Sequence, residues 1–405
     1  MARDYEPSHD YIEPEAEERT LSEGFVGRSR AALRFSRYLL LCIFVLILAI
    51  TVMLNRDSIN MDNLRRLFAK IDIGISSSED VDGKQIEFAF EEDAAVSSFK
   101  DGLAYLTPSQ LTVMDNLGTV FMSTETGFSA PSLITSPRYI VAYDRGGTGL
   151  IVTNSFAVVF EKTMPEKISY VTLSEDYYLS VITTGGGYKN SLYVYNQNFE
   201  EIYVWHSNER YLLNAAVSPD RKTVALVCYK TAEASAQAEL VGIKLGQEEI
   251  AWSVSLAGLP LDMSYKNSNL IALLFDDRVE FLNGKGGAGA VYQFEKNFLQ
   301  GFSLSEDHTL LVLSAGKLGD STLYEISNRG KASCTFDAKT RIRAMDVKGN
   351  NVALLTDQET LVYSTVSKKV IYRKAGDSNV RDVAFGGKNC LLDIYSTYCV
   401  YNEIN

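Results

Sequence analysis

Short runs of alternating apolar and polar residues, separated by turn residues, fill the chain from residue 84 to residue 405. Residues 170–173, 223–227 and 360–363 are examples of such runs. Alternation with a period of two is typical of half-buried β-strands. Three of the intervening turns have the form Ser-x-Asp, in which short side-chain oxygens accept hydrogen bonds from nearby backbone N–H groups. These structural turn motifs contain Ser174, Asp176, Ser218, Asp220, Ser305 and Asp307.

The turns recur at a steady distance, which indicates a repeat fold. Aligned by the apolar runs that follow them, eight positions lie 38 to 46 residues apart: Ser97, Thr135, Ser174, Ser218, Ser264, Ser305, Asp346 and Ala384. Repeats of ~40–45 residues with several strands each are typical of a β-propeller. The last repeat has room for three strands only, and residues 85–90 supply a spare alternating run before the first. We predict an all-β, eight-bladed propeller over residues 84–405, closed by this N-terminal strand, with seven blades as the alternative.

One segment has the composition of a membrane span. Residues 38–54 contain no charged residue and lie between Arg37 and Asn55-Arg56. At ~1.5 Å per residue, this length is at the short end for a transmembrane helix. A cleaved signal peptide is the rival interpretation, but 37 residues precede the run and no Ala-x-Ala follows it. We therefore predict an uncleaved single-pass transmembrane helix.

The flanking residues predict how this helix is oriented. The topology determinants are four arginines within the ten residues before the span: Arg28, Arg30, Arg34 and Arg37. Because positive charge favours the cytoplasmic side, the N-terminus is expected in the cytoplasm and the propeller outside, at the cell membrane. Residues 1–37 then form an acidic, disordered cytoplasmic tail with this basic flank. Residues 55–83 form a juxtamembrane stalk helix and linker, in which residues 61–71 show apolar positions at helical spacing.

Composition narrows the chemistry further. The 405 residues have a net charge of −12, which argues against a nucleic-acid partner, and the three histidines make histidine-rich metal sites and most His-dependent catalysis improbable. The five cysteines show no CxxC spacing and fit small core residues, although Cys390 and Cys399 lie in adjacent predicted strands and pairing between them stays open.

Gly284–Gly289 matches GxGxxG, but a strand follows instead of a helix, so we interpret it as a loop. Asp276-Asp277 is interpreted as a pair of turn acids, because no Asp-x-Asp-x-Asp-Gly loop is present.

No sequence motif indicates catalysis. Gly-x-Ser-x-Gly is absent. Pairs of carboxylates could still assemble from different blades, as glycoside hydrolysis requires, and the sequence does not decide this. We predict a protein that is not an enzyme and has no cofactor, metal or catalytic residues.

The Ser-x-Asp turns followed by strands and Leu-Tyr-x-Tyr runs resemble bacterial WD40-like and YVTN repeats. Residues 246–253, ending in Trp252-Ser253, resemble the Gly-to-Trp segment of quinoprotein-like repeats, and residues 198–205 are a fainter copy. That resemblance implies that Trp205 and Trp252 dock each blade on its neighbour. The whole layout resembles a family of single-pass membrane propellers of Gram-positive bacteria, which implies no activity and no functional residues.

These observations predict a membrane-anchored, extracytoplasmic propeller that acts as a protein-interaction scaffold at the cell envelope. Its loops would form a broad docking face for another envelope protein. The alternative is a receptor that binds a small molecule or a cell-wall glycan in the propeller channel, where some of the 23 tyrosines could stack on sugars. A quinoprotein-like or hydrolytic enzyme is the interpretation that these observations favour least.

Overall fold

The computed structural model describes residues 38–46, 62–63, 65–66, 83–88, 94–232, 235–316, 319–387 and 389–404. The chain divides into two units, residues 1–67 and residues 68–405. In the first unit, residues 38–46, 62–63 and 65–66 are helical, and the side chains of residues 38–46 are exposed. Among the residues described, no helix is long and apolar enough to cross a membrane. The rest of the predicted span and the tail, with Arg28, Arg30, Arg34 and Arg37, lie outside the described residues.

The second unit consists of eight four-stranded antiparallel sheets, one per blade. Blades 1 to 4 comprise β2 (Ala95–Phe99), β3 (Gly102–Leu106), β4 (Gln110–Met114), β5 (Val120–Glu125); β6 (Pro131–Thr135), β7 (Ile140–Asp144), β8 (Gly149–Thr153), β9 (Val158–Thr163); β10 (Lys167–Leu173), β11 (Leu179–Gly185), β12 (Tyr188–Tyr195), β13 (Glu201–Ser207); β14 (Arg210–Val217), β15 (Thr223–Ala232), β16 (Ser235–Lys244) and β17 (Ile250–Leu256).

Blades 5 to 8 comprise β18 (Asp262–Asn267), β19 (Leu270–Leu274), β20 (Arg278–Asn283), β21 (Ala288–Gln293); β22 (Phe298–Leu304), β23 (Thr309–Ser314), β24 (Ser321–Ile326), β25 (Ala332–Asp337); β26 (Ile342–Lys348), β27 (Asn351–Thr356), β28 (Glu359–Ser364), β29 (Lys369–Ala375); β30 (Asp382–Phe385), β31 (Cys390–Ile394), β32 (Tyr398–Glu403) and β1 (Gln85–Glu87).

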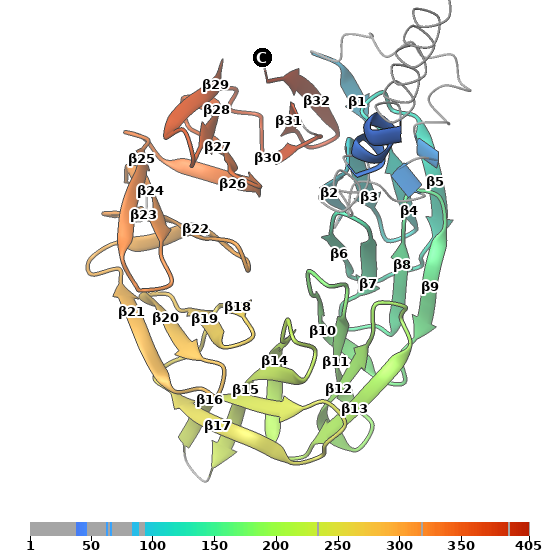
Figure 1. Cartoon of the computed structure of the whole chain (residues 1–405), viewed down its shortest axis with the longest axis vertical. Helices are drawn as coiled ribbons and strands as arrows, with labels where there is room; N and C mark the ends of the chain where they lie inside the picture. Colours follow the sequence, from blue (N-terminus) through green and yellow to red (C-terminus); the bar gives the residue numbers. More distant parts are fainter. Residues whose placement is uncertain are drawn as a thin grey trace, which may run out of the picture. The chain divides into compact units, whose positions relative to one another are not determined.

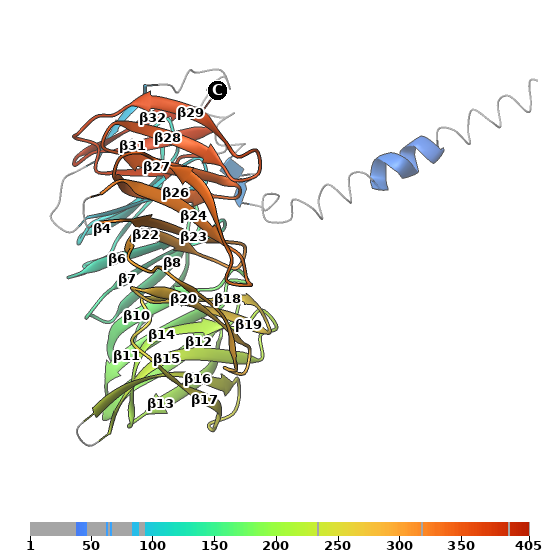
Figure 2. The same ribbon diagram turned by 90° about the vertical axis from the view of Figure 1, so that its left-hand side faces the viewer.

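The blades follow one another around a ring, and β30–β32 return beside β1–β3 (Figure 1). Seen from the side, the strands cross the ring from one face to the other (Figure 2). The first strand of each blade is innermost, and the innermost strands of blades 8 and 1, β30 and β2, are in contact. The prediction of an eight-bladed β-propeller is therefore confirmed, and the seven-blade alternative is wrong.

The N-terminal strand closes the ring as predicted. β1 is the outermost strand of blade 8 and pairs antiparallel with β32, with Ile86 opposite Cys399. Backbone bonds continue the pairing beyond the strand, from Gly83 N to Tyr401 O at 2.8 Å and from Phe88 N to Thr397 O at 3.0 Å. Both ends of the propeller domain thus share one sheet, which leaves no blade incomplete.

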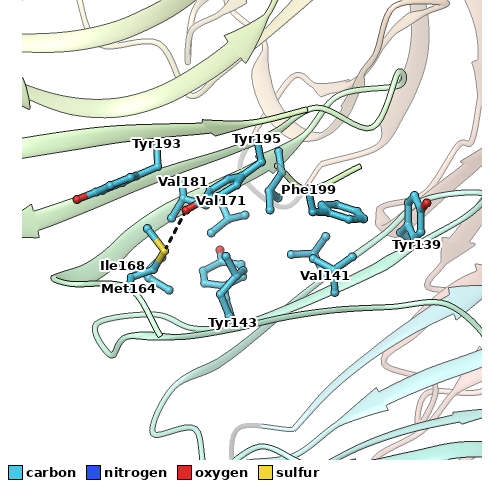
Figure 3. Close-up of a cluster of buried hydrophobic side chains, with 13 residues drawn as sticks. Tyr139, Val141, Tyr143, Met164, Ile168, Val171, Val181, Tyr193, Tyr195 and Phe199 are labelled. Atoms are coloured by element: carbon cyan, nitrogen blue, oxygen red, sulfur yellow. Dashed lines mark hydrogen bonds between the residues drawn. The ribbon is translucent and has the colours of Figure 1, made fainter. Parts of the chain in front are cut away.

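Hydrophobic packing lies between blades. Each of the eight hydrophobic clusters among the described residues combines side chains from two consecutive blades, and the last joins blade 8 to blade 1. In the cluster between blades 2 and 3, Tyr139, Val141 and Tyr143 face Val171, Val181 and Tyr195 (Figure 3). Burial of this kind contributes roughly 25 cal/mol per Å² of apolar surface, so the ring is stabilised mainly at its blade interfaces.

Polar side chains on the innermost strands add specific bonds between blades. Asn214 Nδ2 on β14 donates to Asp262 Oδ1 on β18 at 3.2 Å, and Phe385 N on β30 donates to Asp346 Oδ2 on β26 at 2.7 Å. Burial raises the pKa of both carboxyl groups above the usual value for aspartate. These acids therefore join blade to blade.

The antiparallel order defines two faces of the ring. In blades 1 to 7 the turn between first and second strands lies at the same edge as the turn between third and fourth strands. We call this edge the entry face, because β1 begins there, beside the end of β32. The opposite edge, which carries the loops from one blade to the next, is the far face.

Five of the eight repeat positions are strand residues and not turn residues. Ser97, Ser264, Asp346 and Ala384 lie inside the innermost strands, whereas Ser174, Ser218 and Ser305 begin turns and Thr135 ends a strand. In blades 1, 5 and 7 the turn is only two residues long, in contrast to five in blades 3 and 4. The repeats were aligned on the second strand of each blade. Where the turn before that strand is short, the aligned position therefore falls in the first strand and not in the turn.

Candidate functional site

The three Ser-x-Asp motifs form first-to-second-strand turns on the entry face, in blades 3, 4 and 6. The serine hydroxyl accepts a backbone N–H across each turn: Ser174 from Tyr178 at 2.9 Å, Ser218 from Thr223 at 3.1 Å and Ser305 from His308 at 3.3 Å. In blade 4 the Ser218 hydroxyl also donates to Asp220 at 2.6 Å. These serines order the turns, as the sequence pattern indicates.

Two of these turns are joined by an ion pair. The Arg221 guanidinium of blade 4 donates two hydrogen bonds to the Asp176 carboxylate of blade 3, at 3.0 and 3.2 Å. Arg221 has a φ of 62°, the left-handed conformation that non-glycine residues adopt mostly in turns. Because both side chains are exposed to a third or more, the pair contributes only about 0–1 kcal/mol. Its main effect is to fix one turn relative to the other.

A second contact joins blades that are not neighbours. The Glu175 carboxyl group of blade 3 interacts electrostatically with Glu306 and Asp307 in the blade 6 turn. Burial raises the pKa of Glu175, and the nearby Glu306 and Asp307 carboxylates raise it further. Carboxylates placed close together disfavour one another's ionised form. The entry face therefore contains a carboxyl pair assembled from distant blades, a possibility that the sequence had left open.

A lysine of blade 5 binds the blade 6 turn that carries Glu306. Lys266 on β18 is 6% exposed, and its Nζ donates to Ser305 O and His308 O in the blade 6 turn. Burial lowers the Lys266 pKa to about 8, although the Asp307, Glu175 and Glu306 carboxylates oppose the shift. The His308 ring bonds to the Ser303 and Ser305 hydroxyls, and burial lowers its pKa. Hydrogen bonds from Lys266 and from the His308 ring thus fix the conformation of the turn that carries Glu306.

The two tryptophans lie on outermost strands, each against the following blade. Trp205 on β13 is 9% exposed, and its Nε1–H donates to Glu248 O of blade 4 at 3.0 Å. The Trp252 ring on β17 lies 3.0 Å from the position that a Cβ on Gly286 of blade 5 would occupy. Any side chain at Gly286 would press on that ring. Both positions are what the quinoprotein-like resemblance implies.

The far face carries a different feature, which we call the mouth patch: Tyr211, Leu261 and Phe298. Each lies six residues before the last residue of an innermost strand, in blades 4, 5 and 6. Tyr211 is the second residue of β14, Phe298 is the first residue of β22, and Leu261 directly precedes β18. The side chains are 43%, 55% and 45% exposed. Two further exposed apolar residues accompany them near the far face, Leu213 and Leu259.

The members of the mouth patch belong to blades that touch. β14 contacts β18 and β18 contacts β22. Leu213 and Leu261 are the sequence neighbours of Asn214 and Asp262, whose side chains are hydrogen-bonded. Exposed apolar side chains on one edge of neighbouring blades form a candidate protein interaction site. Sequence reasoning missed this patch, because each residue alone resembles an ordinary strand residue; only its repetition at one strand position in consecutive blades distinguishes it.

The remaining candidates have structural positions. Residues 284–287 form the turn between β20 and β21, and residues 288–289, the end of the GxGxxG match, begin β21. Asp276-Asp277 lies in the turn between β19 and β20. The register places Cys390 opposite Glu403 and Cys399 opposite Ile394, and no disulfide joins the two cysteines. Four of the tyrosines that prompted the idea of a sugar receptor, Tyr139, Tyr143, Tyr193 and Tyr195, pack between blades. In the part of the chain that the structure describes, no group of three His, Cys, Asp or Glu side chains could hold a metal ion.

Solved structures share this fold. The C-terminal WD40 domain of Sif2 matches with a TM-score of 0.55 at 13% identity, over 80% of this chain and 99% of that one. The computationally designed Ika8 protein matches with a TM-score of 0.52 at 13% identity, over 80% and 98% of the two chains. Dihydro-heme d1 dehydrogenase NirN gives a TM-score of 0.49 at 12% identity, over 70% and 67%. Identities this low carry the fold alone.

Comparison at the level of sequence identifies one family. Among the curated proteins, none matches this chain. Residues 79–400 match the model of a family of unknown function, DUF5711. The match spans nearly the whole propeller.

Proposed function

The chain belongs to the DUF5711 family, and we propose that it is a membrane-tethered interaction scaffold whose propeller binds an apolar segment of a partner protein at the mouth patch. The observation that carries this proposal is the exposure of Tyr211, Leu261 and Phe298 at one position in three consecutive blades. Aromatic and large apolar side chains dominate binding energy when a partner buries them. The proposal assigns no reaction to the propeller.

The tether is the second part of the proposal. Residues 38–54 are an uncharged run, and four arginines precede them. Positive charge on that side favours an N-terminus in the cytoplasm and a propeller outside the cell membrane. The partner would then be another envelope protein. A ring of packed blades suits this role, because interface clusters and inter-blade bonds hold in place the strands that carry its loops.

Crosslinking in intact cells tests the proposal with the full-length chain. One variant carries Tyr211→Ser, Leu261→Ser and Phe298→Ser. The matched control carries Ile202→Ser, Val291→Ser and Ile371→Ser, three exposed apolar residues on outermost strands. We expect a discrete partner whose crosslinked yield falls at least tenfold in the first variant, at roughly 1 kcal/mol or more per buried side chain, and stays unchanged in the control.

Two results would contradict the proposal. One is a partner whose yield is the same in both variants, because the mouth patch would then make no contact with it. The other is the absence of any specific partner for the native chain. Circular dichroism of each variant establishes that the propeller remains folded, which separates lost binding from lost structure.

A further inference from the structure

Positive charge is concentrated on one sector of the propeller. Residues 329–388 contain 12 Lys and Arg and 6 Asp and Glu, in a protein whose net charge is −12. Four of these bases flank the third-to-fourth-strand turns of blades 6 and 7: Arg329, Lys331, Lys368 and Lys369. All four are exposed, and none forms an ion pair with another described residue. Val366, in the blade 7 turn, is 72% exposed.

These turns lie on the entry face, the face at which the chain enters the propeller. Gly83 bonds to Tyr401 at the entry-face end of blade 8, and blade 8 follows blade 7 in the ring. Only residues 55–82 separate this point from the apolar run 38–54. Fully extended, those residues reach about 100 Å, at roughly 3.5 Å each. A membrane that held residues 38–54 would therefore stay within reach of the basic turns.

The entry-face turns of blades 6 and 7 carry these four bases against two acids, Glu306 and Asp307. The same face has the opposite charge on its other side. The turns of blades 3 and 4 carry Glu175, Asp176, Glu200, Asp220, Glu248 and Glu249, against Arg221, Lys222 and Lys244. An anionic surface would attract the side next to the tether and repel the remote side. The charge distribution thus favours one orientation of the ring.

We propose that the basic turns of blades 6 and 7 dock on anionic phospholipid headgroups of the membrane that holds the chain, with Val366 inserted among them. This proposal rests on the membrane tether of the proposed function. Lysine and arginine near an anionic leaflet each favour the bound state about fivefold, and an exposed valine adds apolar contact with the headgroup boundary. Such attraction is weak between free molecules but effective for a tethered domain, because the tether raises the local concentration of lipid.

Lipid-dependent quenching in vesicles tests the docking with the full-length chain. Cys42 and Cys334, the exposed cysteines, are replaced by serine. A fluorophore is then attached at Ser367→Cys in the blade 7 turn or, as the far-face control, at Asp276→Cys. Vesicles contain a headgroup-attached quencher and either zwitterionic lipid alone or about one-third anionic phospholipid. Flotation of the protein with the vesicles is measured in parallel.

We expect the protein to float with both vesicles and quenching at residue 367 to require anionic lipid, while residue 276 stays unquenched. Lys368→Gln with Lys369→Gln should lower the ratio of docked to undocked propeller roughly 30-fold. The matched change on the acidic side, Lys222→Gln with Lys244→Gln, should leave it unchanged. Flotation without anionic-dependent quenching would overturn the docking while keeping the tether. Failure to float would overturn the tether and the docking with it.

Discussion

Ile86→Ala tests whether the three-residue strand β1 holds the ring closed. Ile86 is 7% exposed and belongs to the cluster that joins blade 8 to blade 1. Gly118 of blade 1 lies directly against it, since a Cβ there would be 3.8 Å from the Ile86 side chain. The substitution removes three carbon groups, which corresponds to about 2.4 kcal/mol at ~0.8 kcal/mol each. Buried Ile→Ala changes cost roughly 2–5 kcal/mol. A short edge strand can relax, so we expect about 2–3 kcal/mol.

Urea unfolding of the full-length protein in detergent measures this cost. The matched control is Ile371→Ala on β29, the outermost strand of the preceding blade, where the side chain is 39% exposed. There we expect less than about 1 kcal/mol, because much of the side chain already contacts solvent. Trp205 and Trp252, in blades 3 and 4, report unfolding far from the substitution. Hydrogen exchange should accelerate first in β32 and β2, where opening begins.

Equal shifts of the midpoint for Ile86→Ala and Ile371→Ala would refute the reasoning. The ring would then be closed by contacts of the innermost strands β30 and β2, and β1 would be an attachment without a role in closure. A changed dependence on urea would indicate that the blades unfold separately, in which case midpoints alone no longer measure the closing energy.

Three further predictions concern the inter-blade contacts and the thiols. Trp205→Phe should cost about 1 kcal/mol in urea unfolding, because Glu248 O loses its indole donor; an unchanged midpoint would show that packing alone docks the blade. Glu175 has a higher pKa in the folded state than its ordinary value of 4.5 in the unfolded chain. The contribution of protonated Glu175 to the free energy of unfolding is therefore complete below pH 4.5 and is lost as the pH rises through the folded-state pKa. Glu175→Gln should therefore raise the thermal midpoint at pH 7 but not at pH 4, and an equal rise at both would contradict the raised pKa of Glu175. Burial raises the pKa of Cys228 and of Cys399 to about 12, so a thiol reagent at pH 8 should label exposed Cys334 within minutes and those two only on unfolding; rapid labelling of Cys228 in the native protein would show that blade 4 opens.

The fold could be predicted from the sequence because a propeller repeats one local pattern. Hairpins form between runs adjacent in the chain, so the spacing of 38 to 46 residues was sufficient to count the blades. The closing strand was also predictable, since the last repeat lacked a fourth strand and residues 85–87 alternate. Turn positions were less certain. Strand alternation survives a change from a five-residue to a two-residue turn, and Ser97 and Ser264 therefore lay inside strands.

The contacts between distant blades could not be predicted in this way. Glu175 and Glu306 belong to blades 3 and 6, and their interaction depends on the three-dimensional placement of two turns that are far apart in the chain. The mouth patch could not be predicted from the sequence for a related reason. Alternation shows that Tyr211, Leu261 and Phe298 fit a strand, but it does not show which residues at the start of an innermost strand stay uncovered by the next blade. That depends on packing between repeats.

The two proposed surfaces are compatible because they lie on opposite faces. The basic turns occupy the entry face of blades 6 and 7, whereas the mouth patch occupies the far face of blades 4 to 6. A propeller docked through the basic turns would leave the mouth patch turned away from the bilayer. Docking and partner binding should then not compete. Because lipid contact would restrict the tumbling of the ring, it should lower the orientational cost of association. Lys368→Gln with Lys369→Gln should accordingly weaken partner capture in cells without touching the patch, and an unchanged yield would show that orientation contributes nothing.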